Sequence, residues 1–486
     1  MPKLLQKGVK LYWKSLQKGV KLYWKSLQKG VILYWKSLQK GGNMLKRKID
    51  NVLLDWYKRE DHNPLIVYGS RQIGKSTSIL NFAKQFYKSV IEINFIRDKE
   101  YKKIFDDGFN PDDINYNISL INPSHQFIPN DTLIFFDEIQ DQIDVVSALK
   151  FYSLDGRFDV ICSGSMLGIN YKKITSISVG FKEDYHMYSM DFEEFLWACG
   201  YDENLVNKIF DNMCNLEPLS DLEFNKLSKI FKQFITVGGL PNIVNHFVQD
   251  KTLYNVIQLQ NQLYIDYEND IKNYVNGLDV SRVVNFYRHI TPMLSRDNHK
   301  FQISKIGHGA KNREFVGCDE WLKDAGIINI AYNINDLTLP LKGNEIESDK
   351  RIYYSDNALL IASLDEYAKE DLRINNNFEI YNGALTESFV SEGLIKSGYK
   401  ELYFYKNKNH TIEIDFVVRC KNELVPIEVK TRKGRTKSLN NVLQDNKFKF
   451  GIKLTNQNIG YSNKKYTFPY FLTFLLNRFL EKKINW

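Results

Sequence analysis

Residues 65 to 77 read LIVYGSRQIGKST, an apolar run followed by the pattern G-x-x-x-x-G-K-S. The run from Leu65 to Tyr68 is short and ends at a glycine, which indicates a buried parallel strand entering a tight turn. Apolar residues then recur at helical spacing, at Ile79, Phe82, Ala83 and Phe86. A strand, a glycine-rich turn and a helix in this order predict a site that binds phosphate groups.

Each residue type in this loop has a physical role. Gly69 and Gly74 let the backbone fold tightly and direct N–H groups at phosphate oxygens. Lys75 is expected to reach the β and γ phosphates, and Ser76 to hold Mg²⁺. The alternative is an ordinary glycine-rich turn. If the loop binds ATP, the contacting residues are Gly69, Ser70, Arg71, Gln72, Ile73, Gly74, Lys75, Ser76 and Thr77.

A pair of carboxylates follows the next strongly apolar run. Leu133 to Phe136 is apolar and leads directly into Asp137 and Glu138. Such residues lie at the strand ends where ligands of a parallel sheet bind. Asp137 is therefore expected in the Mg²⁺ shell, and Glu138 is expected to orient or deprotonate the water that attacks the γ phosphate. Many strands end at acidic turns, but after a phosphate loop the pattern becomes specific.

Three further strands complete the expected sheet. Val90 to Phe95 and Asp159 to Ser165 are expected to be strands, and Tyr185 to Met190 would supply the fifth. Ser163 ends one of them and could contact the γ phosphate or the attacking water, although a simple Ser/Gly turn fits equally well. The alternation of strands and helices predicts an α/β domain with a doubly wound parallel sheet.

The net charge of +8 comes from the N-terminus. Residues 1 to 43 contain ten lysines and no acidic residue, and removing them leaves 56 basic and 58 acidic side chains, a net charge of −2. Global charge therefore says nothing about nucleic acid, and any basic patch must be local.

The same N-terminal segment is a tandem repeat. Leu5 to Ser15 reads LQKGVKLYWKS, Leu16 to Ser26 repeats it unchanged, and Leu27 to Ser37 repeats it with Ile32 in place of lysine. A period of eleven residues can describe a right-handed supercoil, and the sequence could also form a cationic membrane-surface helix that carries Trp. A glycine in each copy weakens both interpretations. Near-identity favours a disordered or artefactual extension, with translation starting at Met44.

The rest of the composition indicates a cytoplasmic protein. The five cysteines are scattered and lack C-x-x-C spacing, which fits a reduced compartment and argues against structural zinc. No run reaches the roughly 18 apolar residues of a membrane span, and no signal peptide is evident, so no membrane association is expected.

The middle of the chain reads as mainly helical. Val237 to Pro241 (VGGLP) interrupts the helices and suits a nucleotide-dependent hinge or a simple turn. Residues 301 to 333 suggest a winged helix, with helices at Ile303 to Ile306 and Asn312 to Ala325 and a wing strand at Ile327 to Ala331. Its partner is either protein or DNA, and the DNA phosphates would face Lys305, His308, Lys311 and Arg313.

A second group of charged residues lies near the C-terminus. Ile412 to Val418 and Leu424 to Val429 are β-prone runs that predict a hairpin. A two-residue turn at Lys421 and Asn422 would place Asp415 opposite Glu428, with Lys430 on the same face as Glu428. The alternative is a surface salt bridge between Glu428 and Lys430.

Five segments resemble the archaeal and bacterial AAA+ ATPases that carry a C-terminal domain of nuclease-like fold. They read GSRQIGKST, LIFFDEIQ, ICSGSMLG, MYSMDFEEFL and VGGLP. The resemblance runs from about Met44 to the C-terminus and implies ATP and Mg²⁺ as cofactors. One departure is Phe181 after Gly180, where the family usually has Arg or Lys to contact nucleotide or a neighbouring subunit. Lys182 or Lys172 could substitute, and a homo-oligomer stays open.

The C-terminal residues resemble the PD-(D/E)XK nuclease core. The resemblance implies that Asp415 and Glu428 are metal ligands, that Lys430 stabilises charge or activates water, and that Glu387, on a helix from Gly383 to Gly393, assists. Ile414 stands where the motif has proline.

The expected plan has five parts: a repeat (1–43), a P-loop AAA+ ATPase domain (44–195), a helical lid or linker (196–275), a winged-helix-like region (276–370) and a nuclease-like α/β domain (371–486). The first hypothesis for function is an ATPase coupled to a nuclease-like domain acting on nucleic acid. The second is an ATP-dependent switch whose C-terminal domain binds partners and cuts nothing. A membrane-surface peptide fused to an ATPase ranks last.

Overall fold

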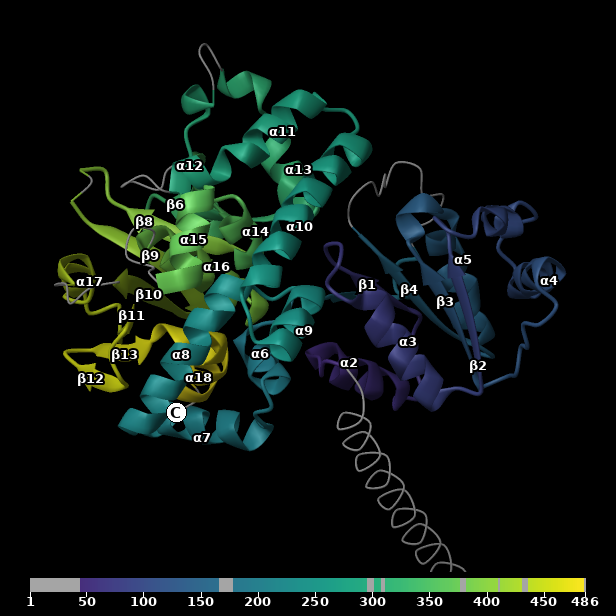
Figure 1. Ribbon diagram of the computed structural model, residues 1–486, viewed down its shortest axis with the longest axis horizontal. Helices are drawn as coiled ribbons and strands as arrows, with labels where there is room; N and C mark the ends of the chain where they lie inside the picture. The colour runs from purple at the N-terminus through teal and green to yellow at the C-terminus, as the bar shows by residue number, and fades with distance from the viewer. Residues whose placement is uncertain are drawn as a thin grey trace, which may run out of the picture. The chain divides into compact units, whose positions relative to one another are not determined.

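The computed structural model describes residues 44–165, 178–294, 301–306, 311–375, 382–409, 411–430 and 436–484. Internal contacts divide the chain into two units, Met1–Lys46 and Arg47–Trp486. The N-terminal repeat lies outside the described residues. Figure 1 labels the helices and strands of the second unit.

The first sheet has five strands in the order β2-β3-β4-β1-β5, and every neighbouring pair is parallel. The strands are β1 (Leu65–Tyr68), β2 (Ser89–Asn94), β3 (Thr132–Asp137), β4 (Asp159–Gly164) and β5 (Glu183–His186). An all-parallel sheet of five strands is typical of P-loop proteins, so the α/β parallel architecture expected for this part is confirmed.

The fifth strand begins and ends earlier than the sequence predicted. We expected Tyr185 to Met190, whereas β5 ends at His186. The Met187 N–H still donates to the carbonyl of Tyr68 (2.7 Å), but Met190 N–H donates to the carbonyl of Gly239 (2.6 Å). The chain therefore leaves the sheet because its backbone pairs with a turn between two later helices.

Helices surround this sheet (Figure 1). They are α2 (Lys48–Tyr57), α3 (Lys75–Phe86), α4 (Pro111–Ile121) and α5 (Asp144–Asp155), with short 3-10 helices η1 (Lys99–Phe105) and η2 (Ile139–Asp141). A buried core joins α4 and α5 to one face of the sheet, because alternate strand residues such as Ile134 and Phe136 point to it. Ile79, Phe82 and Ala83 are buried on α3, as their spacing predicted.

The middle of the chain is helical, as expected. It contains α6 (Phe192–Ala198), α7 (Glu203–Asn215), α8 (Asp221–Val237), α9 (Pro241–Asp250), α10 (Tyr254–Tyr274), α11 (Val280–Arg288) and α12 (Ile290–Leu294). Side chains of Asp191, Asp202, Ser220 and Asp279 accept hydrogen bonds from backbone N–H groups at helix starts. Such caps satisfy donors that have no partner within the helix.

The VGGLP segment is the tightly packed turn between α8 and α9. Gly238 has φ of +78°, and a Cβ atom there would lie 2.4 Å from Oδ1 of Asp356. A Cβ atom on Gly239 would lie 2.0 Å from the carbonyl oxygen of Met190. The two glycines are therefore required because two other segments approach the turn closely.

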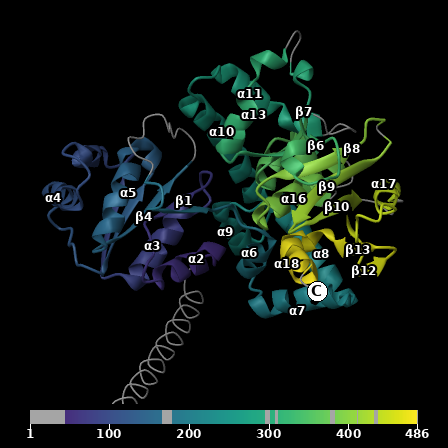
Figure 2. The same cartoon turned by 180° about the vertical axis from the view of Figure 1, so that it is seen from behind.

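The second sheet is mixed and has eight strands in the order β12-β13-β11-β10-β9-β8-β6-β7. Figure 2 shows β8, β9 and β10 from behind. The strands are β6 (Ile328–Ile334), β7 (Glu345–Tyr354), β8 (Leu402–Lys406), β9 (Glu413–Cys420), β10 (Glu423–Lys430), β11 (Gly451–Thr455), β12 (Gly460–Ser462) and β13 (Lys465–Pro469).

The winged-helix prediction is wrong for the wing strand. Residues expected to form a wing belong to β6, which pairs with β7 on one side and β8 on the other. The sheet therefore runs across residue 370, where we expected a domain boundary. The expected helices are reduced to η4 (Ile303–Lys305), η5 (Asn312–Glu314) and α13 (Cys318–Asp324) in the part described. Apolar β6 residues are buried between two strands, and periodicity alone does not distinguish such a strand from a wing.

The remaining C-terminal elements are helices around this sheet. They are η6 (Leu341–Asn344), α14 (Asn357–Ala362), α15 (Glu366–Asn375), α16 (Asn382–Lys396), α17 (Lys437–Val442), η7 (Tyr470–Leu475) and α18 (Leu476–Ile484). The predicted hairpin is confirmed, since β9 and β10 pair Cys420 with Glu423 and Phe416 with Ile427. Among the described residues, no helix is both long and apolar enough to cross a membrane.

Candidate functional site

The phosphate loop connects β1 to α3. Gly69 lies so close to neighbouring chain that a Cβ atom would be 2.3 Å from the carbonyl oxygen of Met187. Gln72 and Gly74 have positive φ angles of 62° and 90°, and Gly74 precedes the first residue of α3. The loop thus folds tightly against the helix N-terminus, where backbone N–H groups and the helix dipole favour an anion.

Lys75 is bonded to the loop's own backbone. Its Nζ donates to the carbonyl of Gly69 (2.9 Å) and to the carbonyl of Ser70 (2.8 Å). Burial lowers the pKa of Lys75 to about 8, although Glu138 and Asp137 oppose this shift. The ammonium must leave these carbonyls to reach a phosphate.

Three polar side chains contact Asp137 at the carboxyl ends of the strands. Ser76 Oγ lies 2.9 Å from Asp137 Oδ2, and Ser163 Oγ donates to Asp137 Oδ1. Asn94 Nδ2 donates to Asp137 Oδ2 at 2.9 Å. The structure therefore brings Ser76, Asp137 and Ser163 together. Sequence reasoning missed Asn94, although its position at the end of β2, the neighbour of β3, is a signal that could have found it.

Glu138 follows in a left-handed conformation, with φ of +58°. Gln140 Nε2 donates to Glu138 Oε2, and Gln140 Oε1 accepts from the N–H of Ser165 (3.2 Å). Gln140 thus connects the predicted base to the end of β4. A non-glycine residue in this conformation is uncommon and occurs often at functional sites.

Phe181 and Lys182 have partners outside the phosphate loop. The Phe181 ring has Lys150 Nζ 5.3 Å from its centre. Lys182 Nζ pairs with the carboxylate of Asp184 at 2.6 Å. Lys172 lies outside the described residues. In the part of the chain that is described, no hydrogen bond or ion pair joins Lys182 to the phosphate loop.

The phosphate loop is instead held by α10. Arg71 Nη1 pairs with Asp270 Oδ1 at 2.6 Å, and Arg71 Nη2 donates to the hydroxyl of Tyr274 at 2.6 Å. The guanidinium also lies 4.6 Å from the centre of the Tyr274 ring. Tyr267 donates its hydroxyl to the carbonyl of Arg71 (3.0 Å). Two turns of one helix therefore contact both the side chain and the backbone of this loop residue.

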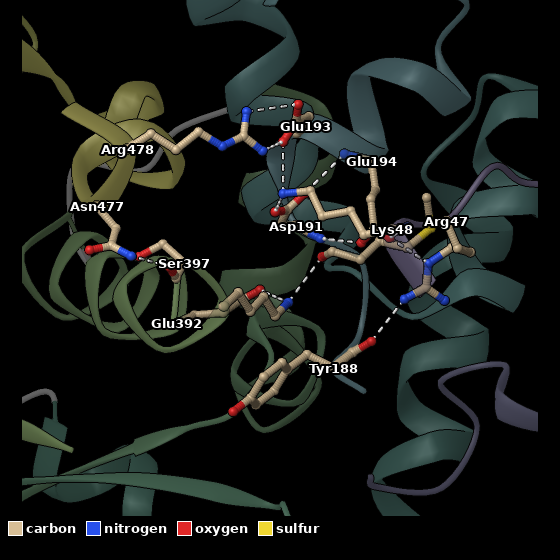
Figure 3. A network of polar contacts seen from close by, with 12 residues as sticks. Arg47, Lys48, Tyr188, Asp191, Glu193, Glu194, Glu392, Ser397, Asn477 and Arg478 are labelled. Atoms are coloured by element: carbon tan, nitrogen blue, oxygen red, sulfur yellow. Dashed lines mark hydrogen bonds and ion pairs between the residues drawn. The ribbon is translucent and has the colours of Figure 1, made fainter. Parts of the chain in front are cut away.

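Arg47 contacts the other side of the loop. Its Nη1 donates to the carbonyl of Ile73 (2.7 Å), and its Nη2 donates to the carbonyl of Tyr188 (2.8 Å). Its Nε pairs with Glu194 at 3.0 Å (Figure 3). All three bonds are made by one buried guanidinium, which therefore joins the phosphate loop to the segment between β5 and α6.

This segment and α6 contact the C-terminal part of the chain. Glu193 pairs with Lys48 (2.7 Å) and with Arg478 of α18 (2.5 Å), as Figure 3 shows. Lys396 of α16 donates to the carbonyl of Met190 (3.0 Å).

Asp356 is the centre of this junction. It accepts hydrogen bonds from the N–H of Gly239 (3.0 Å), from Ser189 Oγ (2.5 Å) and from Lys396 Nζ (3.4 Å). Lys396 also pairs with Glu392. We refer to Ser189, Gly239, Asp356, Glu392 and Lys396 as the Asp356 junction.

A second polar site lies in the mixed sheet. Asp415 Oδ2 accepts from the N–H of Val429 (2.7 Å) where the β9–β10 ladder ends, and Glu428 Oε1 pairs with Lys430 at 2.9 Å. Glu428 is 2% exposed, and its Oε2 has no hydrogen-bond partner. Burial, together with the nearby Glu387, raises the pKa of Asp415 to about 7. The hydrogen-bonded pairs of β9 and β10 end at Phe416 and Ile427, one residue before the predicted Asp415–Glu428 pair, and Glu387 faces a different partner.

That partner is Arg351 of β7. Arg351 Nη1 lies 3.3 Å from Glu387 Oε2 and 3.8 Å from Asp415 Oδ1, and Nη2 pairs with Glu413. We call Glu387, Glu413 and Asp415 the acidic cluster. Sequence reasoning missed Arg351 and Glu413, since no local pattern marks either one.

The two sites differ in how well they fit a metal ion. Near the phosphate loop, one hydroxyl and one carboxylate, from Ser76 and Asp137, face each other beside Lys75, and this donor set suits a Mg²⁺ that also binds phosphate oxygens. In the mixed sheet a guanidinium already contacts the acidic cluster. Among the described residues, no group of three or more His, Cys, Asp or Glu side chains is arranged to hold a metal. The metal site implied by Asp415 and Glu428 stays a prediction.

Comparisons with known proteins identify three regions. Residues 61–196 match the family model of an AAA domain, AAA_14. Residues 228–370 and 382–471 match two domains of unknown function, DUF8612 and DUF4143. No curated protein sequence matches this chain.

Solved structures are similar at low sequence identity. The Walker-type ATPase paby2304 of Pyrococcus abyssi has 12% identity and a TM-score of 0.40, over 66% of this chain and 96% of that one. The Thermotoga maritima RuvB Holliday junction branch migration motor has 11% identity and a TM-score of 0.29, over 58% and 89%. C. elegans PCH-2 has 10% identity and a TM-score of 0.25, over 44% and 63%.

Proposed function

We propose that this chain, whose residues 61–196 form an AAA-type P-loop ATPase domain, is an ATP-dependent switch whose C-terminal domain binds a partner and cuts nothing. ATP binding changes the contacts of the phosphate loop, and hydrolysis restores them. This is the second of the two functions that the sequence left open.

One observation carries the proposal: α10 binds the phosphate loop through the side chain of Arg71. The ion pair with Asp270 and the hydrogen bond that Arg71 donates to the Tyr274 hydroxyl are both 2.6 Å long. A loop that closes around phosphate groups cannot move its backbone or Arg71 without changing these bonds. Nucleotide binding would therefore change the contacts of α10, a helix of the middle region. A switch requires such a coupling between the nucleotide site and another part of the protein.

The residues around Asp137 are assigned roles in hydrolysis. Mg²⁺, when bound with ATP, would neutralise the charge that develops on the phosphates. Ser76 and Asp137 would hold this ion, and Lys75 would exchange the carbonyls of Gly69 and Ser70 for phosphate oxygens. Glu138 would orient the attacking water, with Gln140 fixing its carboxylate. Ser163, which donates to Asp137, would contact the γ phosphate or that water.

The binding of α10 to Arg71 is tested by Asp270→Asn, which removes the charge partner of Arg71 at constant size. We expect ATP to speed amide hydrogen exchange in the last turns of α10 in the unaltered chain. Asp270→Asn is expected to show fast exchange without ATP and to bind ATP about fivefold more tightly, because a partly exposed ion pair contributes roughly 1 kcal/mol. Hydrogen exchange with mass spectrometry and ATP titration measure both.

Two variants serve as controls. Asp266→Asn removes a carboxylate one turn away that bonds Gln262 and not Arg71, so it should leave exchange and affinity unchanged. Lys75→Ala should abolish nucleotide binding and every ATP-dependent change. If ATP leaves α10 exchange unaltered in the unaltered chain, α10 does not sense the nucleotide and the switch is rejected.

A second candidate function is metal-dependent cleavage of nucleic acid. The observation that favours it is the buried Glu428 Oε2 without a partner, beside Lys430. A cleavage assay with plasmid and Mg²⁺, with and without ATP, distinguishes the two functions. The switch predicts no cleavage, whereas cleavage that is lost in Lys430→Ala would establish the nuclease.

Nucleic-acid binding without cleavage is a separate outcome. Exposed Lys305, Lys311 and Arg313 remain available for phosphate contact. Binding through them would weaken steeply with salt. Duplex DNA that causes no shift at low salt would leave a protein partner as the target of the switch.

A further inference from the structure

Arg351 is a buried cation in the middle of the acidic cluster. Its side chain is 4% exposed, and Arg351 contacts all three carboxylates, from β9 and α16. An unpaired guanidinium would be very costly at this depth, so the three carboxylates are its counter-ions.

Other side chains fix the guanidinium in this place. Its Cζ lies 4.4 Å from the centre of the Phe404 ring on β8. Tyr353, two residues along β7 and on the same face, donates its hydroxyl to Glu387 Oε2 (3.1 Å). Lys406 adds a second positive charge, 3.4 Å from Glu413. The cluster therefore has aromatic packing, a hydroxyl donor and two cations.

These contacts use the oxygens that a metal ion would need. Mg²⁺ binds carboxylate oxygens at about 2.0–2.1 Å and Mn²⁺ prefers the same hard ligands, so a guanidinium at these oxygens competes with either ion. Arg351 Nη1 lies between Glu387 and Asp415, at 3.3 Å and 3.8 Å from their nearest oxygens. A divalent ion bound by these two residues would collide with it electrostatically and sterically.

We propose that Arg351 is a built-in cation that holds Glu387, Glu413 and Asp415 together without metal, and that removing Arg351 opens a site for a hard divalent cation. This inference concerns the mixed sheet and does not depend on the ATP switch. Its consequence is that the acidic residues of this domain stabilise the sheet and α16.

The test uses the full chain without nucleotide, treated with EDTA, with Mn²⁺ as the probe. Bound Mn²⁺ is counted by electron paramagnetic resonance for the unaltered chain, Arg351→Ala and Arg351→Gln. We expect no Mn²⁺ bound at the cluster of the unaltered chain and one ion per chain in each variant. Adding Asp415→Asn to Arg351→Ala should abolish that binding, which locates the ion.

Thermal unfolding gives a second readout. Breaking a buried ion pair leaves uncompensated charges, so Arg351→Ala should unfold roughly 10 °C lower in EDTA, and Mn²⁺ should recover at least half of that loss. The matched control is Arg288→Ala, which removes an exposed arginine from Glu268 and should show no response to Mn²⁺.

Several outcomes overturn the proposal. One is Mn²⁺ binding by the unaltered chain that Asp415→Asn abolishes, because Arg351 would then not exclude the ion. Another is a folded Arg351 variant that binds no Mn²⁺. If neither variant folds in EDTA, folding on addition of Mn²⁺ supports the proposal, and failure to fold with Mn²⁺ overturns it.

Discussion

Single side chains at the strand ends show how local sequence and neighbouring strands combine. The apolar run before Asp137 predicted a carboxylate at the end of a buried strand, and Asp137 is the last residue of β3. Asn94 carries no such signal, yet it donates to the same carboxylate because β2 is the hydrogen-bonded neighbour of β3. The side chains that contact Asp137 therefore depend on the neighbouring strand as well as on the residues next to Asp137 in the sequence.

Glu392 provides a prediction at this scale. Burial raises its pKa to about 8, helped by Asp356 and opposed by Lys396, the charged groups that face it. Because the pKa of Glu392 is raised in the folded state, the contribution of Glu392 to the free energy of unfolding is fully present below its ordinary pKa near 4.5. This contribution is lost as the pH rises through about 8. Between these values the unaltered chain should lose on the order of a few kcal/mol relative to Glu392→Gln.

Chemical denaturation across pH 5 to 8 measures this difference. Asp191, which contributes to the field at Lys396, is unchanged in both chains. Parallel pH profiles of the unaltered chain and Glu392→Gln would show that Glu392 is ionised at no cost in the folded state.

Among the elements, the β9–β10 hairpin was the most accurately predicted. Period-two alternation and a two-residue turn at Lys421 and Asn422 set its register, and the pairs from Cys420–Glu423 to Phe416–Ile427 agree. The turn contains one unfavourable backbone conformation, since Lys421, a residue with a side chain, has φ of +53°. A left-handed conformation costs a non-glycine residue roughly 1 kcal/mol.

This conformation predicts that Lys421→Gly stabilises the hairpin. Glycine adopts the left-handed conformation without strain, so the free energy of unfolding should rise by about 0.5–1 kcal/mol. Lys421→Val should lower it, because a β-branched residue resists this φ more strongly. Urea denaturation of both variants is the measurement, and a loss of stability in Lys421→Gly would contradict the argument.

The strand β6 is the element that sequence reasoning placed wrongly. Its apolar run was expected to be the wing of a winged helix, and it lies between β7 and β8 of the mixed sheet. A run buried on both faces has no alternation to reveal its partners. Its neighbour β8 begins at Leu402, so this pairing is invisible to any short window of sequence.

Across the whole unit, the Asp356 junction connects parts that are distant in the sequence. Asp356 binds the segment after β5 through Ser189, the α8–α9 turn through Gly239, and α16 through Lys396. The side chains of Ser189, Asp356 and Lys396 are buried. The junction thus joins the ATPase domain to the helical region and the mixed sheet by one carboxylate.

Asp356→Ala should therefore lower the free energy of unfolding by about 3–5 kcal/mol, because it leaves Lys396 and the Gly239 N–H without this partner in the interior. Asp356→Asn, of the same size, should be less harmful. Denaturation of Ser189→Ala, Asp356→Asn and the double variant gives their coupling energy. If the two effects on the free energy of unfolding are additive, Ser189 and Asp356 have no coupling energy, and this outcome would contradict the proposed role of the junction.

The sequence by itself determined the parallel ATPase sheet, the phosphate loop with its following helix, the position of Asp137 and Glu138, and the register of the C-terminal hairpin. Each of these depends on contacts within a few residues or on a periodicity of two or 3.6 residues, which sequence displays directly.

Tertiary structure alone decided what surrounds those motifs. Arg71 meets Asp270 across 199 positions, and Arg351 meets Glu413 across 62. Neither separation leaves a local pattern, because long-range pairs are selected by the packing of whole elements. The nuclease-like spacing of Asp415, Glu428 and Lys430 was therefore readable, but the arginine that neutralises the neighbouring carboxylates was not. That arginine came from a strand assigned to another domain, and it pairs with Glu387 and Asp415 of the predicted site.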